Sequence, residues 1–484
     1  MDSSASQIAA PTAEVADLKA QIAHILSTLT PEITRLKSEN ADLRLENAAL
    51  KKRVKLLEAK LKLDSTNSHQ PPSADMPKDK PPTNGPPKPG KLKKGAQPGH
   101  PFHERNLVDL QPGDSVVPYL PICPCGAKNA FDDLDLIERF QRFELPLRPV
   151  EVTEFQCYAG TCIHCKQRVE AVFPEALSRH AFGDRLTAFI AMASGEWHLS
   201  KRQIQAMLEA LLGVPISVGS VVDQQQVVSQ ALAGAHEDIA TQVRSSHVAN
   251  VDETSWEVAG KLHWLWVMVN AMSALFLIQD SRSGEAARAL IGEFDGVLGS
   301  DRYKSYEQFN HLLRQLCWAH LVRDFLKWEL KGSRNASALL NNTRRLFEAW
   351  WDYKAGKKTW EEFQVSASIA RTCMTMWLKK VEAEKLPEVS GKATELLRQW
   401  EHAWTFAHHP GIEPTNNLAE RMLRKAVLWR KCSFGTASEK GSRFAERILS
   451  FLATMKLRGK DQLDALEEAV KAFRAGGLIR VPAL

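Results

Sequence analysis

Three acidic residues occur in local sequences that suggest metal-dependent chemistry. Asp252 ends the β-prone run 247–251, and Asp301 ends the short run 296–300. Glu420 lies in a segment that, at 100° per residue, forms a helix whose polar side carries this carboxylate. The other side of that helix is apolar and can pack on a sheet: Leu418, Ala419, Met422, Leu423 and Ala426. Three carboxylates brought together could bind a divalent cation, since hard cations prefer oxygen ligands.

The same residues also fit interpretations that need no metal. Aspartates at the ends of strands are common in turns. Asn417 and Glu420 have the spacing of a helix-capping pair, and Glu420 and Arg424 have the spacing of an i,i+4 ion pair. Spacing alone leaves both interpretations open.

A second cluster of possible ligands is formed by cysteines, because five of the eight lie between residues 123 and 165. Two close pairs could complete a closed, structural zinc site: Cys123, Cys125, Cys162 and Cys165. The first pair has only one intervening residue, which strains the knuckle, and Cys157 or His164 could substitute. The alternative is a set of buried cysteines without metal. We predict a small, β-rich, zinc-ribbon-like module over residues 102–175.

The elements around the acidic residues follow a recognisable order. Residues 247–252, 262–270 and 274–280 are rich in strand formers and predict three antiparallel strands. A helix over 284–294, a short strand over 296–301 and a buried strand over 315–320 are expected next.

This β-β-β-α-β-α-β order is typical of the ribonuclease-H-like fold, in which the first and fourth strands are neighbours. Asp252 and Asp301 would then meet at adjacent strand positions. We expect this core over residues 241–455, interrupted by a helical insertion at 321–405 and followed by a C-terminal element at 456–484.

The N-terminal region predicts a long helix over residues 14–63. Thr30-Pro31-Glu32 is typical of a helix start. From there apolar residues alternate three and four apart, with asparagine at two core positions: Ile33, Leu36, Asn40, Leu43, Asn47, Leu50, Val54, Leu57 and Leu61. This heptad repeat favours a parallel dimeric coiled coil, and buried asparagine fixes its register. The alternative is an amphipathic helix packed on its own domain.

Two further segments separate this helix from the acidic residues. Residues 64–101 contain several lysines, and nine prolines fall between Pro71 and Pro98. This composition predicts a semi-extended linker that either follows a phosphate backbone or is simply solvated. Residues 176–240 are helical, with a break at Gly213-Val-Pro215 that resembles a helix-turn-helix. An ordinary helical hairpin fits as well, because the second helix carries few basic side chains.

Composition narrows the class of protein. The 484 residues are 44% hydrophobic and 25% charged, which excludes a mostly disordered or collagen-like chain. No apolar run is long enough for a membrane span, and the N-terminus does not resemble a secretory signal. We therefore expect a soluble, cytoplasmic, multi-domain α+β protein.

The net charge of +6 does not by itself indicate nucleic acid, so the local distribution is decisive. Eight basic residues face four acidic ones between Glu413 and Arg447. The candidate DNA-binding residues around Glu420 are Arg421, Arg424, Lys425, Arg430 and Lys431. Such a basic helix beside an acidic metal site suits a phosphate backbone, whereas a solvated charged helix is the alternative. For the tryptophans of residues 321–405, core packing is the expected role, rather than stacking on DNA.

Several motifs in order make the chain resemble a known family, the large transposases of the insertion-sequence sixty-six (IS 66) family, which are DDE enzymes. The resemblance includes the leucine-repeat helix, the cysteine knuckle and the following segments: Asp64-Ser-Thr-Asn-Ser-His-Gln-Pro-Pro-Ser, Gly95-Ala-Gln-Pro-Gly-His100, Val251-Asp252-Glu-Thr, Ser300-Asp301-Arg-Tyr, Cys317-Trp-Ala-His320 and Asn416-Asn-Leu-Ala-Glu420-Arg. The chain departs from the family pattern at Cys123-Pro-Cys125, where two intervening residues are usual, and at Arg302, where glycine is frequent.

The resemblance implies that Asp252, Asp301 and Glu420 bind two Mg²⁺ (or Mn²⁺) ions roughly 3.5–4 Å apart, one activating the attacking water or DNA 3′-hydroxyl and the other stabilising the leaving oxygen. Hydrolysis would free a 3′-hydroxyl at the end of the element, which would then attack target DNA. No covalent intermediate between protein and DNA is expected. The implied partners are the terminal repeats, target DNA, a second copy of the chain and accessory proteins of the same element. The implied location is the bacterial cytoplasm, in association with the nucleoid when the protein is bound to DNA.

Two other functions stay open at this point. A ribonuclease-H-like nuclease without strand transfer would use the same three carboxylates. A catalytically inactive DNA-binding regulator, with coiled coil and zinc module, would not need them.

Overall fold

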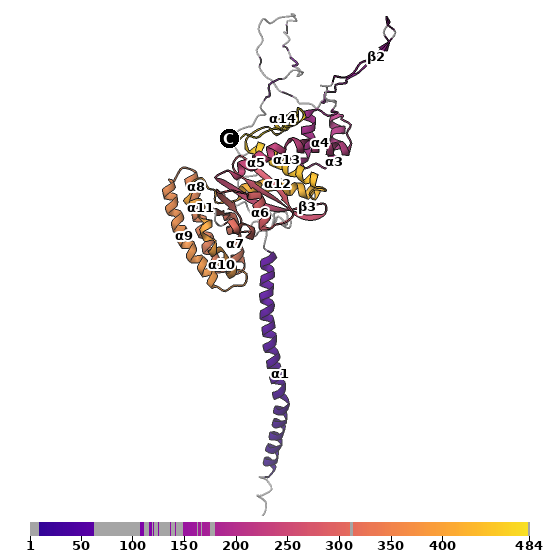
Figure 1. Ribbon diagram of the computed structural model, residues 1–484. Helices are drawn as coiled ribbons and strands as arrows, with labels where there is room; N and C mark the ends of the chain where they lie inside the picture. The colour runs from indigo at the N-terminus through magenta and orange to yellow at the C-terminus, as the bar shows by residue number, and fades with distance from the viewer. Residues whose placement is uncertain are drawn as a thin grey trace, which may run out of the picture. The chain divides into compact units, whose positions relative to one another are not determined.

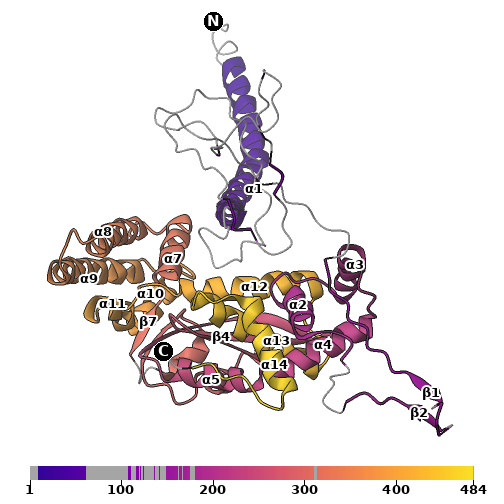
Figure 2. The same ribbon diagram turned by 90° about the horizontal axis from the view of Figure 1, so that it is seen from above.

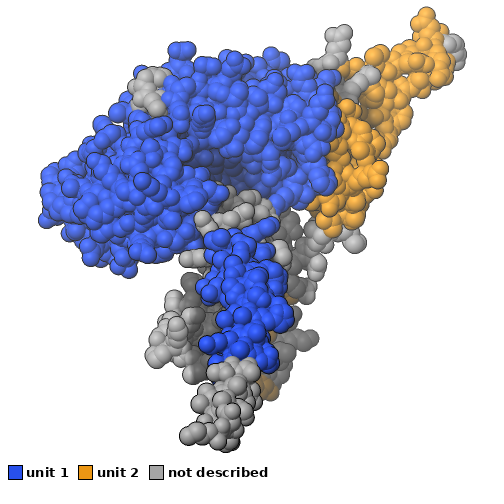
Figure 3. Space-filling model, turned by 90° about the horizontal axis from the view of Figure 1, so that it is seen from below, with its two compact units in different colours: residues 1–77, 184–198, 225–484 blue, residues 78–183, 199–224 orange. Residues whose placement is uncertain are grey.

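The computed structural model describes residues 9–61, 107–110, 116–118, 120, 124, 136, 141, 149–161, 163–165, 167–174, 180–309 and 313–482. The chain divides into two compact units, one formed by residues 1–77, 184–198 and 225–484, the other by residues 78–183 and 199–224 (Figure 3). The first unit contains the predicted acidic site. No helix in the described parts of the chain is long and apolar enough to span a membrane.

The N-terminal helix α1 (Ala9–Leu61) is longer than predicted and continuous (Figure 1). Pro31 lies inside it, so the expected helix start at Thr30-Pro31 is wrong. Proline lacks a backbone N–H and therefore leaves the carbonyl of Ser27 without its intrahelical donor. Neighbouring hydroxyls bond to backbone carbonyls on both sides, as Thr30 does to Leu26 and Thr34 does to Thr30. The helix therefore runs through the proline instead of beginning at it.

The second unit contains a short hairpin made of β1 (Ala159–Thr161) and β2 (Arg168–Glu170), which pair antiparallel. Its turn carries Cys165, which is exposed, as is Cys157. The predicted ligands Cys123, Cys125 and Cys162 lie outside the described residues. The same unit includes α3 (Lys201–Leu212), which begins at a capping box on Ser200 and ends at the left-handed Gly213. The predicted break after α3 is confirmed, and α4 (Val218–Ala231) follows it.

A five-stranded sheet forms the centre of the first unit. Its strands are β3 (Val248–Val258), β4 (Lys261–Val269), β5 (Ala274–Gln279), β6 (Val297–Ser300) and β7 (Arg314–Leu316), in the spatial order β5-β4-β3-β6-β7. β3, β4 and β5 pair antiparallel as predicted, whereas β6 pairs parallel to both β3 and β7. β3 and β6, the first and fourth strands of this sheet in sequence order, are therefore neighbours.

The end of the sheet differs from the sequence prediction in two places. The link from β6 to β7 contains a 3₁₀-helix, η2 (Lys304–Phe309), where an α-helix was expected. The fifth strand stops at Leu316, and Cys317-Trp-Ala-His320 is not a strand: Cys317 caps α7 (Trp318–Leu330), and the next three residues form its first turn. A buried apolar run of this length does not by itself distinguish a strand from the start of a buried helix.

Helices cover the sheet (Figure 2). The helices on the sheet are α5 (Ala233–Arg244), α6 (Gly284–Ile291), α12 (Asn417–Ser433) and α13 (Glu439–Leu457). Helices α2 (Asp184–Gly195) and α14 (Gln462–Arg474) pack on α13 and on each other. Helix α12 packs on β3 and β4, and α13 packs on β5. The apolar side predicted for α12 is confirmed, because Ala419, Leu423 and Ala426 are buried in the main core.

Helix α13 also protects the edge strand β5. Three side chains on one side of α13 accept hydrogen bonds from alternate backbone N–H groups of β5: Glu446 from Ile278 (2.7 Å), Ser450 from Phe276 (2.8 Å) and Thr454 from Ala274 (3.1 Å). Unpaired N–H groups at a sheet edge invite pairing with another chain. These side chains supply the acceptors that a further strand would otherwise provide.

A helical group lies between β7 and α12 in the sequence. It contains α7, α8 (Ala336–Lys354), α9 (Trp360–Ala383), α10 (Ser390–Arg398), η3 (Trp400–Ala403) and α11 (Thr405–His408). The α-helices of this group lie together in Figure 1. Its core includes the buried rings of Trp318, Trp328, Trp350, Trp400 and Trp404. Core packing is therefore the role of most of the tryptophans, as predicted, whereas Trp351 is exposed.

We predict that Ser450→Ala destabilises the protein. The buried N–H of Phe276 would lose its acceptor, which typically lowers the free energy of unfolding by about 1–3 kcal/mol. Denaturant unfolding would measure the change. Ser368→Ala, at an exposed position of α9, is the matched control. Equal stability of the two variants would contradict the edge-protecting role of α13.

Candidate active site

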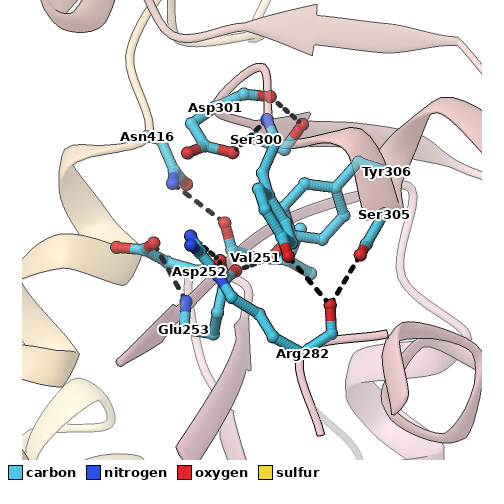
Figure 4. Close-up of polar contacts among 10 residues, drawn as sticks. Val251, Asp252, Glu253, Arg282, Ser300, Asp301, Ser305, Tyr306 and Asn416 are labelled. Atoms are coloured by element: carbon cyan, nitrogen blue, oxygen red, sulfur yellow. Dashed lines mark hydrogen bonds and ion pairs between the residues drawn. The ribbon is translucent and has the colours of Figure 1, made fainter. Parts of the chain in front are cut away.

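The parallel pairing of β3 and β6 brings two of the predicted carboxylates together. Asn250 is the Cα partner of Gly299; Asp252 lies two positions further along β3, and Asp301 directly follows Ser300, the last residue of β6. The two aspartates therefore lie at adjacent positions at the end of the paired region, and the charge of Asp301 reaches Asp252. Figure 4 shows the two carboxylates in one neighbourhood, together with Asn416 from the start of α12.

Next to these aspartates, the close approach of β6 to β3 requires a glycine. A Cβ at position 299 would overlap Oδ1 of Asn250 on the neighbouring strand. Gly299 therefore lets β6 approach β3 closely while Asn250 occupies the space between them.

Each aspartate accepts a local backbone hydrogen bond that orients its carboxylate. Oδ1 of Asp252 accepts from the N–H of Glu253 (2.9 Å), and Oδ1 of Asp301 accepts from the N–H of Tyr303 (2.8 Å). Arg314, buried on β7, donates to the carbonyl of Asp301 (3.3 Å) and to the hydroxyl of Ser300 (3.0 Å). Both aspartates are therefore oriented by hydrogen bonds from the surrounding chain.

The electrostatics show that these carboxylates repel one another. Burial, followed by the charges of Glu253 and Asp301, raises the pKa of Asp252 well above its ordinary value of 3.8. Glu420 raises it further, so this carboxylate also lies within electrostatic reach. Burial lowers the pKa of the nearby Arg314 to about 10. A bound cation would relieve the repulsion among the carboxylates.

Asn416, at the start of the helix that carries Glu420, is hydrogen-bonded to the sheet. Its side chain is 1% exposed, and its Nδ2 donates to the carbonyl of Val251 (2.9 Å), the residue before Asp252. Its backbone N–H donates to Sγ of Cys317 (3.2 Å), whose own N–H donates to the carbonyl of Ser300 (2.9 Å). The starts of α7 and α12 are thus bonded to the strand positions that carry the aspartates.

Glu420 lies in the first turn of α12, close to a histidine and an arginine of α7. Its Oε1 is 3.6 Å from Nδ1 of His320, and its Oε2 is 3.7 Å from a guanidinium nitrogen of Arg323. The alternative roles expected from spacing are wrong: the helix begins after Asn416 without a side-chain cap, and the ion pairs of Glu420 are with α7, not with Arg424.

A different set of potential ligands also meets at Glu420. In the described chain, one group of three has its ligand atoms all within 4.8 Å of one another, and it comprises Cys317, His320 and Glu420. The thiol is a poor candidate ligand, since it already accepts the N–H of Asn416 and burial raises the pKa of Cys317 to about 11. We therefore assign Cys317 to the attachment of α12. Among the described residues, Glu420 does not form a group of this kind with Asp252 and Asp301.

The neighbour of Asp252 on the opposite face of β3 is part of a buried ion pair. The side chain of Glu253 is 1% exposed, accepts two hydrogen bonds from Arg282 (2.7 and 2.5 Å) and accepts another from the hydroxyl of Tyr306. The Arg282 guanidinium stacks 3.6 Å from the centre of the Tyr303 ring. Burial and the charge of Asp301 raise the pKa of Glu253, and the contacts with Tyr306 and Arg282 oppose part of that shift. This carboxylate is therefore paired within the protein.

The predicted DNA-binding residues fall into two groups. Lys425 pairs with Glu196, and Arg430 donates to Ser255, so both make intramolecular contacts. The other three, Arg421, Arg424 and Lys431, are exposed.

Sequence reasoning did not identify the residues that position these groups. Asn416 was noted on the polar side of the helix and in a family motif, but it is buried and bonded to β3. Cys317, His320 and Arg323 could have been grouped by their helical spacing, had the segment not been interpreted as a strand. Arg282 and Tyr306 have no sequence signal that connects them to Glu253, because they meet it only in the folded chain.

The raised pKa of Asp252 predicts a pH-dependent stability of the metal-free protein. Its folded-state pKa lies above the unfolded value, so the protonated carboxyl stabilises the fold below the unfolded pKa. That contribution is lost as pH rises through the folded pKa. We expect Asp252→Asn to raise the Tm of the metal-free protein at pH 8, and the difference to shrink as pH falls towards 4.

Calorimetric or fluorescence melting in a chelator would measure this effect. Asp295→Asn, at an exposed position just before β6, is the control and should not share it. A Tm for Asp252→Asn below that of the unsubstituted protein at pH 8 would contradict the repulsion inferred here.

Comparison with known proteins gives an independent view of the same residues. The family model for "Transposase IS66 family" matches residues 179–444, which include β3 to β7, the helical group and α12. A second model, a family of unknown function (DUF6444), matches residues 8–106.

Similar curated proteins come from Sinorhizobium fredii (strain NBRC 101917 / NGR234). The uncharacterized protein y4qI is 25% identical over 244 residues, which are 44% of this chain and 44% of that protein. The uncharacterized protein y4hP is 23% identical over 400 residues, 74% of this chain and 70% of that protein. The chain thus spans less than half the length of the first of these relatives.

The family match covers more than half of the chain, and the acidic strand positions and the helix with Glu420 all lie inside it. The chain belongs to the IS66 family of transposases.

Proposed function

We propose that this chain cleaves DNA at the ends of an insertion sequence and transfers the resulting 3′-hydroxyl ends to target DNA, with a ribonuclease-H-like core of the DDE type. The observation that carries the proposal is the parallel register of β3 and β6, with Asp252 and Asp301 each two residues beyond the paired Asn250 and Gly299. The strand order β5-β4-β3-β6-β7 is the order that the ribonuclease-H-like fold requires.

Asp252, Asp301 and Glu420 would hold divalent cations, either Mg²⁺ or Mn²⁺. Two observations fit this assignment: the carboxylates raise the pKa of Asp252, and the buried Oε1 of Glu420 accepts no hydrogen bond from the described residues. Bound cations would supply Lewis-acid chemistry and lower the pKa of the attacking water or hydroxyl. No side-chain nucleophile is required.

The protein's own groups would orient the reactants. Asn416 fixes the start of α12 against β3, and His320 and Arg323 limit the positions that the Glu420 carboxylate can occupy. Arg421 and Arg424, exposed on the same helix, would bind backbone phosphates of the DNA. A basic surface beside an acidic centre suits a polyanion that carries the reacting phosphate.

We predict that Asp252→Asn, Asp301→Asn and Glu420→Gln each reduce end cleavage and strand transfer by more than roughly 100-fold. Altering even the groups that hydrogen-bond to metal ligands typically costs 10–100-fold. An assay with labelled terminal repeats and a supercoiled target would separate nicked from joined products. Asp280→Asn, an exposed aspartate directly after β5, is the control and should retain activity.

The outcomes distinguish the competing functions. Nicking without joined products would favour a nuclease of the same fold. Equal, metal-independent DNA binding by all variants, with no cleavage by the unsubstituted protein, would favour a regulator.

We further propose that α1 forms a parallel coiled coil with a second copy of the chain. Its apolar stripe is about half exposed: Leu18, Ile22, Ile25, Leu29, Ile33, Leu36, Leu43, Leu50 and Val54. An apolar surface of this length is unusual on an isolated helix in water, and asparagine at core positions 40 and 47 suits a paired helix in one register.

We predict that Leu36→Glu combined with Leu43→Glu converts the dimer into a monomer, because two charges would face each other across each core layer. Light scattering coupled to size exclusion would measure the mass. Leu45→Glu is the matched control, since Leu45 lies on the same helix outside the stripe and is 72% exposed. A monomeric unsubstituted protein, or a dimer that survives the double substitution, would contradict the coiled coil.

The role of the second unit is proposed from the sequence. Cys123, Cys125, Cys162 and Cys165 would bind structural zinc, and α3 with α4 would act as a helix-turn-helix that reads the element ends. The antiparallel pairing of β1 and β2 on either side of the second cysteine pair is compatible with a zinc knuckle.

A further inference from the structure

The exposed side of α12 forms a continuous line from the acidic site to the end of the helix. Arg421, Arg424, Leu428 and Lys431 are spaced three, four and three residues apart, so they lie on one side, and all four are exposed. Glu420 borders this line. The buried residues Ala419, Leu423, Ala426 and Trp429 occupy the other side.

This line ends at an aromatic residue in a strained conformation. Phe434 caps α12 with φ 60° and ψ 5°, and its side chain is 73% exposed. A left-handed backbone is uncommon for a residue other than glycine, asparagine or aspartate, and it costs stability. Because the ring is so exposed, packing within the protein contributes little to offset this strain.

The strain is imposed by contacts on both sides of Phe434. Its N–H donates to the carbonyl of Arg430 (2.7 Å), which closes the helix. Gly435 and Thr436 then pair with the end of β3: the N–H of Thr436 donates to the carbonyl of Glu257 (2.8 Å), and a Cβ at Gly435 would overlap that carbonyl. The backbone thus fixes the position from which the Phe434 ring projects.

We propose that Phe434 stacks on an unpaired or unstacked nucleobase of the DNA bound along α12. This inference rests on the proposed function and adds to it a specific contact. Helix geometry places Phe434 about 21 Å along the axis from Glu420, or roughly six nucleotides from the reacting phosphate. Arg421, Arg424 and Lys431 would follow the backbone between them.

The choice of DNA as partner follows from chemistry on this surface. The line carries three cations and no acidic residue, which suits a polyanion better than a second apolar protein surface. Aromatic rings stack on any base, so this contact needs no sequence signal. A rigid apolar side chain that enters a base step favours DNA that is already distorted or open. A strained residue at a ligand-binding surface is a recurrent feature of functional sites.

Binding to two DNA probes would test the inference, using the full chain with Asp252→Asn in a chelator so that no cleavage occurs. One probe is a duplex with a short unpaired 3′ arm, and the other is its fully paired counterpart. We expect Phe434→Asn to weaken binding of the forked probe by roughly 5-fold to 100-fold, the range that base–aromatic stacking supports, with little change for the paired probe. Phe434→Trp should retain the preference.

Three controls separate stacking from a structural role. Asparagine tolerates the left-handed conformation, so Phe434→Asn should keep or raise the Tm. Trp351→Ala removes another aromatic ring, 61% exposed on α8, and should not change the preference for the fork. Arg421→Gln with Arg424→Gln should reduce the salt dependence of binding, whereas Phe434→Asn should not.

Photochemical cross-linking gives a second measurement. With 5-iodouracil in the unpaired arm, irradiation should cross-link the base to Phe434, and the cross-link should be absent in Phe434→Asn. Unchanged fork binding by Phe434→Asn would overturn the proposal, as would a change in oligomeric state without a change in DNA affinity. Neither the binding measurement nor the cross-linking requires cleavage. If the unsubstituted chain never cleaves DNA but still prefers the forked probe through Phe434, only the catalytic proposal is rejected.

Discussion

The parallel pairing of β3 with β6 is the constraint on which the acidic site depends. It fixes Asn250 opposite Gly299 and so places Asp252 and Asp301 at adjacent positions at the end of the paired region. A shift of one residue in this register would take the two aspartates out of adjacent positions. Gly299 makes the register possible, because a larger residue would collide with Asn250. The cost is a group of mutually repelling carboxylates, seen in the raised pKa of Asp252.

The protein distributes its cations so that this repulsion is not fully cancelled. Arg282 pairs with Glu253 on the other face of β3, and Arg314 bonds to backbone and hydroxyl oxygens next to Asp301. The exposed cations of α12 lie along the helix surface. Internal pairing therefore leaves the Asp252 carboxylate with unfavourable electrostatics, which suits a centre that binds a cation and then a phosphate.

The helical group between β7 and α12 lies in the sequence between the strands near the aspartates and the helix that carries Glu420. This group has its own tryptophan-rich core, and after it the chain returns to the sheet. On return, the carbonyl of Pro414 accepts the N–H of Trp318, and Asn416 bonds to both Cys317 and Val251. These bonds place Glu420 next to α7 and within electrostatic reach of Asp252. Family membership and geometry thus direct attention to the same segments.

The sequence by itself determined the local elements and the chemistry of single residues. Alternation identified the antiparallel strands, helical periodicity identified the apolar side of α12, and residue type and position identified the three carboxylates as candidates. These are local properties that depend on neighbouring residues only. The sequence also predicted that the first and fourth strands are adjacent, although only through a fold whose strand order was assumed.

Only the tertiary structure decided which groups meet. The segment Cys317–His320 has the composition of a buried strand, but it forms a helix start because Asn416 and Ser300 supply its hydrogen bonds. Arg430 and Lys425 have the same charge as Arg421, but contacts with Ser255 and Glu196 withdraw them from the surface. The left-handed backbone of Phe434, from which its exposed ring projects, depends on the pairing of Thr436 with β3. In each case the decisive partner is far away in sequence, and no local pattern encodes it.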